Sequence, residues 1–196
     1  MATDLSNLQN FLSNNKTPKK EYPDTITIPL IDKNNPIDSI LNKVDEFRLN
    51  KNPLDIIGVI EKIFRIKLVE QDLGKSASGF LEKIGDQWFI YVNKYENESR
   101  KRFTIAHELG HFIYHSDEYS TNDTSKRDQV FFRDENTNPM EQQANDFASK
   151  LLMPEGIFYK YIQAGDNTIS KLADKFQLST AAVKYRAYKL GLISEY

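Results

Sequence analysis

The three histidines of this 196-residue chain all lie in one short segment, TIAHELGHFIYH. His107 and His111 are four residues apart, and residues with that spacing are neighbours on one face of a helix. Two imidazoles placed in this way can bind one metal ion at about 2.0–2.1 Å each. The HExxH pattern therefore predicts a metal site whose first two ligands are His107 and His111.

Glu108 directly follows the first of these histidines and lies beside the predicted ligands. Zinc lowers the pKa of a bound water molecule, so a carboxylate in this position can accept the proton of that water during attack on a carbonyl. The alternative is a helix whose histidines cap or pack. The metal site is favoured because polar groups on a buried helix need partners. The apolar residues around the motif are Phe103, Ile105, Ala106, Leu109, Phe112 and Ile113.

His115 is expected not to be a ligand. It lies eight residues after His107, which is about 12 Å along a continuous helix. We expect it near the C-terminal end of the helix, where the helix dipole favours a histidine.

A catalytic zinc usually has three protein ligands, and this chain has no cysteine and no further histidine, so the third must be a carboxylate. Glu141 is the strongest candidate because it shares a helix face with small residues that permit close approach of another helix. On spacing alone, Glu141 could equally form a capping box with Asn138 at the start of its helix instead of binding the metal. Asn145, one turn later, could support the site or pack between helices. The alternative carboxylate ligands lie in a polar loop that is expected to face water; they are Asp117, Glu118, Asp134 and Glu135.

The elements that position these residues can be predicted from capping signals and apolar spacing. An Asn-Pro pair followed by an acid predicts helix starts at residues 36, 53 and 139. The motif helix is expected over about 102–115. IKLVE predicts a strand, and GFLEKI and QWFIYVN flank Gly85-Asp86 as a β-hairpin. We therefore expect an α+β fold, mainly helical with a small antiparallel sheet.

The chain divides into three predicted regions. Residues 1–35 are rich in Asn, Lys, Ser and Thr and suggest a mobile arm, with a short helix around Leu5–Leu12. Residues 36–155 hold the predicted metallopeptidase core, and residues 156–196 form a helical tail. The absence of cysteine excludes disulfides and thiolate zinc ligands. Without an apolar run that could cross a bilayer or a secretion signal, we expect a cytoplasmic location and no membrane partner.

The tail resembles a helix-turn-helix, with Ser179 as a cap between two helical stretches. Residues 156–196 contain six Lys and Arg against three acids. DNA binding is therefore an alternative function, in which Lys184, Arg186 and Lys189 would contact phosphates and the metal site would be structural or sensory. The apolar residues of the tail could equally pack on the core.

RFTIAHELGHFIYH followed by EQQANDFASKLLMP resembles the ImmA/IrrE family of zinc metallopeptidases, and the resemblance covers about Ile37–Pro154. It implies a gluzincin-like site in which His107, His111 and Glu141 bind zinc and Glu108 is the general base. It also implies a partner, a helix-turn-helix repressor often encoded nearby in mobile elements, which family members cleave or inactivate. Regulation through partner binding without hydrolysis is a further alternative.

Two parts of the expected reaction stay open. The transition-state oxyanion needs a donor besides zinc, and Tyr114, Tyr119, Arg133 or a backbone N–H could provide it. The strand QWFIYVN could pair with an extended substrate. The alternative is that this segment is an ordinary strand of the sheet. We favour this interpretation for Trp88 and Tyr91, whose side chains are then expected to have no role in substrate binding.

Overall fold

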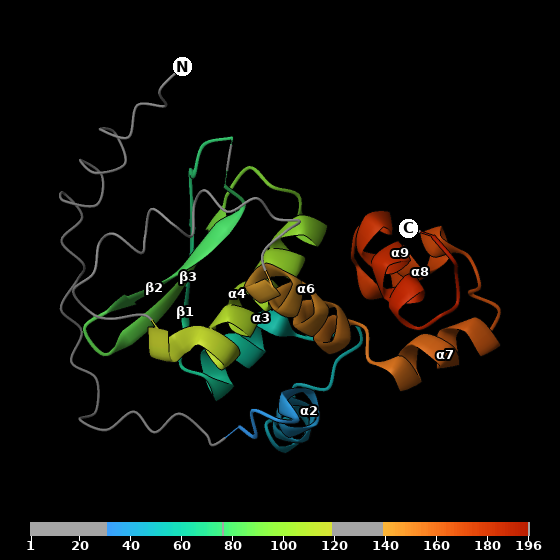
Figure 1. The fold of residues 1–196 in the computed structure, drawn as a ribbon, viewed down its shortest axis with the longest axis horizontal. Coiled ribbons are helices and arrows are strands. Elements are labelled where there is room, and N and C mark those ends of the chain that lie inside the picture. Colours follow the sequence, from blue (N-terminus) through green and yellow to red (C-terminus); the bar gives the residue numbers. More distant parts are fainter. Residues whose placement is uncertain (1–30, 76, 119–138, 196) are drawn as a thin grey trace.

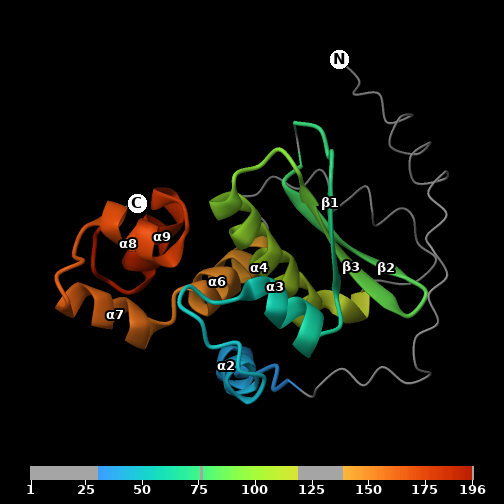
Figure 2. The same cartoon turned by 180° about the vertical axis from the view of Figure 1, so that it is seen from behind.

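The structure is a computed structural model, and it describes residues 31–75, 77–118 and 139–195 (Figure 1). Helices and a small sheet form two layers, with α3, α4 and α6 on one side of the sheet in both views (Figures 1 and 2). The class is therefore α+β and mainly helical, as expected. The predicted arm over residues 1–30 lies outside the described residues.

The sheet has three strands in the order β1-β3-β2: β1 (Lys67–Gln71), β2 (Gly79–Ile84) and β3 (Gln87–Asn93). The β2–β3 hairpin is confirmed, and Gly85 has a φ of +59° in its turn. β1, however, pairs parallel with β3, so the prediction of an antiparallel sheet was wrong. β1 ends beside Asn93, and β2 begins at that same end of the sheet, so the connection passes over the end of β3. Asn93 holds this connection by donating hydrogen bonds to the carbonyls of Gly74 and Ala77.

Of the two helices before the sheet, the first begins at the predicted Asn35-Pro36 pair and the second begins later than predicted. α2 spans Pro36–Glu46, but the Asn35 amide donates to the Asp38 carboxylate instead of accepting from the backbone. The second helix is short, α3 (Ile56–Gly58), and continues as the π-helical turn η1 (Val59–Ile63). Its cap is Asp55, which accepts from Gly58 N at 3.0 Å. The Asn52-Pro53 pair therefore precedes the helix and does not begin it.

The motif helix α4 spans Glu98–His115 and starts about one turn earlier than predicted, because Asn97 caps it by accepting from Arg100 N at 2.9 Å. Its first half lies against β2 at Gly79. A Cβ on Gly79 would lie 2.4 Å from Thr104 Cγ2 and 2.5 Å from the Tyr91 carbonyl oxygen. The absence of a side chain there lets the helix approach the sheet closely, which fixes its position over the strands. A short 3₁₀ turn, η2 (Ser116–Glu118), follows α4.

The C-terminal helices pack on the same core as the rest of the chain. They are α6 (Pro139–Leu152), α7 (Glu155–Gln163), α8 (Ile169–Phe176) and α9 (Thr180–Lys189). Thr168 and Ser179 cap α8 and α9, and Gln177 between them is left-handed, with a φ of +53°. Their buried residues Phe176 and Val183 belong to the main core cluster. The tail is thus docked on the core by its apolar side.

The position of Arg186 contradicts the phosphate contact predicted for it under the DNA-binding alternative. Its side chain is 5% exposed, and Nε donates to the carbonyl of Met153 at 3.0 Å. A guanidinium buried against the end of α6 is not available to a phosphate backbone, so the expected contact of Arg186 with DNA was wrong.

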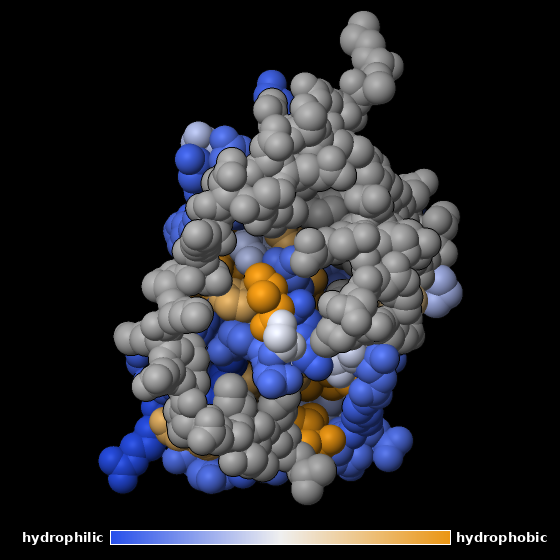
Figure 3. All heavy atoms as spheres, turned by 90° about the vertical axis from the view of Figure 1, so that its left-hand side faces the viewer, coloured by the Kyte–Doolittle hydropathy of each residue, from blue (hydrophilic) through white to orange (hydrophobic). Residues whose placement is uncertain are grey.

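The second face of the sheet, which points away from α4, has a smaller apolar cluster of its own. Figure 3 looks at the molecule from the left-hand side of Figure 1 and shows apolar side chains gathered near the middle of this view, among hydrophilic ones. Among the described residues, no helix is long and apolar enough to cross a membrane.

Candidate metal centre

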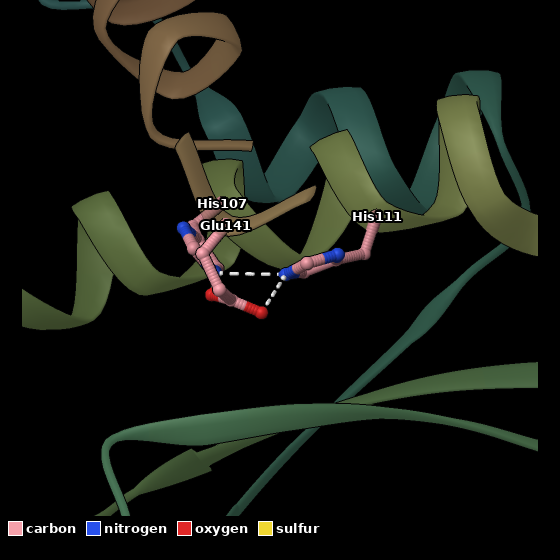
Figure 4. A group of neighbouring side chains, drawn as sticks. All are labelled: His107, His111 and Glu141. Carbon is pink, nitrogen blue, oxygen red and sulfur yellow. Dashed lines mark hydrogen bonds and ion pairs between the residues drawn. The ribbon is translucent and has the colours of Figure 1, made fainter. Parts of the chain in front are cut away.

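Two histidines of α4 and one glutamate of α6 meet at one point (Figure 4). The Nε2 atoms of His107 and His111 are 3.0 Å apart. One carboxylate oxygen of Glu141 lies 3.1 Å from His107 Nε2, and the other lies 3.3 Å from His111 Nε2. These residues, predicted from spacing on two separate segments, are brought together by the fold.

Small residues make this meeting possible at the place where α4 crosses α6. A Cβ on Gly110 would lie 3.1 Å from Ala144 Cα and 3.0 Å from a ring carbon of Phe147. The two backbones therefore approach more closely than two ordinary side chains would allow. Glu141 lies three residues before Ala144 on α6, so the close crossing brings its carboxylate to the imidazoles. Gly110 was not recognised from the sequence as a site residue, although a glycine inside a helical motif is a usable signal of close packing.

Asn145 holds the ring of His107 in one orientation. Nδ1 of His107 lies 2.9 Å from Asn145 Oδ1, and an amide oxygen can only accept, so Nδ1 carries the hydrogen. In the neutral ring this leaves the lone pair on Nε2, which is the atom that faces His111 and Glu141. Of the two readings of Asn145, the geometry supports the one in which it orients the metal site.

The donor set fits a divalent metal ion. Two nitrogens bound to one tetrahedral zinc ion would lie about 3.3 Å apart, close to the 3.0 Å between the two Nε2 atoms. Two imidazole lone pairs at this distance repel each other unless a cation or a shared proton lies between them. The carboxylate adds the negative charge that a divalent ion requires. Neutral imidazoles with a carboxylate are ligands that zinc accepts, as several other divalent ions do.

The charges of the cluster are coupled. Burial pushes the pKa of His107 down, but the hydrogen bond with Glu141 and the nearby carboxylates outweigh burial and raise it above its usual value. Burial likewise pushes the pKa of Glu141 up, yet the two histidines hold it well below its usual range. Glu141 is therefore ionised at neutral pH, as a metal ligand must be.

Glu108 is buried beside the cluster. Burial is the main cause of its raised pKa, and the histidines that attract its charge offset only part of this effect. Within the described part of the chain, its Oε2 atom has no hydrogen-bond partner. A buried carboxylate oxygen without a protein partner and near the imidazoles has the position expected of a proton acceptor.

The other residues singled out from the sequence lie apart from this cluster. His115 ends α4, with its ring centre 5.7 Å from that of His111, and is not a member of the three-residue group. Asp117 is exposed and pairs with Lys33 at 2.9 Å. Tyr114 packs its ring against the edge of Phe147. The structure does not describe the side chain of Glu118 or any of Tyr119, Arg133, Asp134, Glu135 and Asn138.

The strand QWFIYVN is β3, the central strand, and it is paired on both sides. The expectation that it pairs with an extended substrate was therefore wrong. Trp88 and Tyr91 are both buried sheet residues, as predicted by the alternative interpretation of this segment as an ordinary strand. The free edges of the described sheet belong to β1 and β2, and β2 is the edge strand that contacts α4.

Comparison with known proteins gives three results. The family model of the IrrE N-terminal-like domain, a peptidase family, matches residues 61–188, which include the motif helix and most of α9. Metallopeptidase ImmA of Bacillus subtilis (strain 168) is 30% identical over 139 residues, which are 67% of this chain and 75% of the relative. A solved structure of a Mycobacterium tuberculosis transcriptional regulator superposes with a TM-score of 0.54 at 19% identity over 76% of this chain. This chain spans only 44% of that structure, which at such identity shows a shared fold alone.

Proposed function

Because this chain belongs to the ImmA/IrrE family of metallopeptidases, we propose that it is a zinc-dependent endopeptidase of the HExxH type that cleaves a regulatory protein. The observation that carries this proposal is the convergence of His107, His111 and Glu141 from two helices, with their donor atoms all within 4.8 Å of one another. We place the protein in the cytoplasm, where such a substrate would be found.

His107 and His111 would bind the metal through Nε2, and Glu141 would bind it through its carboxylate. Bound zinc supplies a Lewis acid that polarises the scissile carbonyl and makes water acidic enough to lose a proton near neutral pH. The chain contributes a rigid arrangement of these donors, because the close crossing of α4 and α6 leaves little freedom to either helix. Asn145 keeps the hydrogen of His107 on Nδ1, away from the metal-binding atom.

Glu108 is proposed as the general base. Its burial raises its pKa above that of an exposed glutamate, which makes it a better proton acceptor in the ionised state and a usable donor afterwards. The unpartnered Oε2 atom would receive the proton of the attacking water and then pass it to the amine that leaves. This role requires that Glu108 stay off the metal, which its place next to His107, outside the three-residue cluster, supports.

The substrate is proposed to be a folded or partly folded regulator, of which a helix-turn-helix repressor encoded in the same mobile element is the expected example. An extended segment of it could pair with the edge of β2, the strand that lies against the motif helix. DNA binding by the tail has less support. Arg186 is buried, and Lys189 lies 4.0 Å from Asp146.

The decisive experiment compares the wild-type protein with Glu108→Gln on a repressor encoded beside it. The wild type should cleave the repressor, a chelator should stop cleavage, and added zinc should restore it. Glu108→Gln should bind zinc with the wild-type stoichiometry and cut at least about 10³-fold more slowly, because the proton acceptor is lost. Biological activity of Glu108→Gln with no cleavage would mean that partner binding, not proteolysis, is the mechanism.

A further inference from the structure

The outer face of the sheet, which points away from α4, has the composition of a covered surface. Leu73, Phe80 and Tyr91 are buried there, and Val69, Ala77 and Phe89 pack against them. We call these six residues the outer patch. The rings of Phe80 and Tyr91 are stacked, with centres 4.4 Å apart and planes 9° apart. The patch belongs to a cluster separate from the main core, so its burial is not explained by the helices on the other side.

The strand register shows how regular the outer patch is. Val69 on β1 is opposite Tyr91 on β3, and Tyr91 is opposite Phe80 on β2, so one apolar row crosses all three strands. In the next row, Phe89 lies between Lys67 and the buried Glu82, so charged side chains flank the apolar residues. A sheet with helices on one face usually presents polar residues on the other. An apolar row with a polar border is instead typical of a surface that receives another segment.

We propose that the outer patch is the docking site of the chain's own N-terminal segment, residues 1–30. The described chain begins at Ile31, which packs partly on the main core, and Lys33 forms an ion pair with Asp117 in the η2 turn after α4. Thirty residues thus start from a fixed point on the domain. The twenty residues from Phe11 to Ile31 can span about 65 Å when extended, more than the roughly 40 Å diameter of a domain of this size.

The sequence of the N-terminal segment matches the chemistry of the outer patch. Leu5, Leu8 and Leu12 recur at intervals of three and four residues, with Phe11 beside them, so a helix over this stretch has one apolar side. That side is long enough to lie along the row of Val69, Tyr91 and Phe80. Because the segment is tethered, its effective concentration at the sheet is in the millimolar range, so even a weak contact would be populated. A separate partner or a second copy lacks this advantage.

Disulfide trapping tests the proposal in the full-length protein, because the natural chain contains no cysteine. Leu8→Cys is combined with Phe89→Cys on the outer patch or, as the control, with Lys184→Cys on the exposed side of α9. Under mild oxidation the first pair should form an intramolecular disulfide at least ten times faster than the control pair. Equal rates for the two pairs would overturn the proposal, and products that are mainly disulfide-linked dimers would assign the patch to a second copy instead.

A second set of variants protects the result against misfolding of the Phe89→Cys protein. Val69→Cys provides another reporter on β1, in the neighbouring row of the patch. In this set, Leu5→Cys replaces Leu8→Cys as the trapping position, so that Leu8 keeps its side chain. Phe11→Asp is the variant expected to disrupt docking, and Asn10→Asp is its matched control. Phe11→Asp should slow trapping to the rate of the Lys184 control, and Asn10→Asp should not. Unchanged trapping with Phe11→Asp would overturn the docking. None of these readouts involves zinc, so failure here leaves the peptidase proposal untouched.

Discussion

Gly110 lies directly against Ala144, where the motif helix crosses the helix that carries Glu141. A Cβ added to Gly110 would lie 3.1 Å from Ala144 Cα and 3.3 Å from its carbonyl oxygen. Since both contacts are to backbone, they cannot be relieved by rotating a side chain. The spacing between α4 and α6 is therefore set by a residue that would bind no metal itself.

Gly110→Ala should force α6 away from α4 by a few tenths of an ångström. Overpacking of this kind costs about 1–3 kcal/mol of the free energy of unfolding, and the displaced Glu141 should weaken zinc binding by about tenfold. Zinc affinity and thermal unfolding both measure the effect. Gly156→Ala is the matched control, because a Cβ there meets no atom within 4 Å. Equal zinc affinities for the two variants would show that the crossing does not position the ligand.

Asn145→Ala should weaken zinc binding by roughly 10–100-fold, because His107 would lose the acceptor that keeps its hydrogen on Nδ1. Asn145→Asp keeps an acceptor at that position and should bind zinc at least as tightly as the wild type. Isothermal titration with zinc distinguishes the three proteins. Gln143→Ala, on the exposed side of the same helix, provides the control. If Asn145→Ala bound zinc normally, Asn145 would be only a packing residue.

Glu141→Gln distinguishes a metal ligand from a helix cap. A ligand replaced by an amide loses the charge that the cation needs, so zinc content after gel filtration should fall from one equivalent to near zero. A cap replaced by glutamine would keep its hydrogen-bonding role, because both residues serve in a capping box. Retained zinc in the variant would therefore contradict the proposed site. Met140→Gln, beside it on α6, controls for general damage to the helix start.

The histidine pair of the candidate site could be predicted from local helical geometry, whereas spacing alone left Glu141 divided between metal ligand and helix cap. His107 and His111 are separated by one turn of α4, and the acid on α6 heads a stripe of small residues. The distance between the two helices could not be predicted, because it depends on the contact of Gly110 with Ala144 across 34 positions of the chain. A pattern within one helix carries no information about which glycine faces another backbone.

The errors in the fold have a related cause. The direction of β1 is decided by how residues 72–78 cross the end of the sheet, and strand periodicity is the same for parallel and antiparallel pairs. The cap of the second helix was assigned to Asn52 because a proline followed it, although Asp55 is the residue whose side chain accepts the backbone hydrogen bond. Arg186 was named as a phosphate contact only for the case that DNA binds, whereas its neighbours in the fold bury it.

Asp55 should make stability depend on pH. The hydrogen bond from the Gly58 backbone lowers the pKa of its carboxyl more than burial raises it. A carboxyl whose pKa is depressed in the folded state adds stability above its unfolded pKa of about 3.9, and this stability is lost as pH falls through the folded pKa. Asp55→Ala should therefore cost about 0.5–2 kcal/mol at pH 7. Chemical denaturation from pH 7 to below pH 3 should show the stability difference between wild type and Asp55→Ala narrowing as the pH falls below about 3.9. If the stability difference widened toward acid, a group other than Asp55 would cause it. Asp38→Ala, at the start of α2, serves as the comparison.

Arg186→Met should separate the structural role of the tail from DNA binding. The variant keeps much of the side-chain volume but leaves the Met153 carbonyl without its donor, which costs about 1–3 kcal/mol in a buried site. Lys184→Met, on the exposed side of the same helix, should change the free energy of unfolding by less than about 0.5 kcal/mol. Urea denaturation gives both values, and duplex DNA titrated at low salt provides the second readout. Since Arg186 points into the protein, its loss should leave any weak DNA affinity unchanged once folding is accounted for. A fully folded Arg186→Met protein that had lost salt-dependent duplex binding would instead support the regulator.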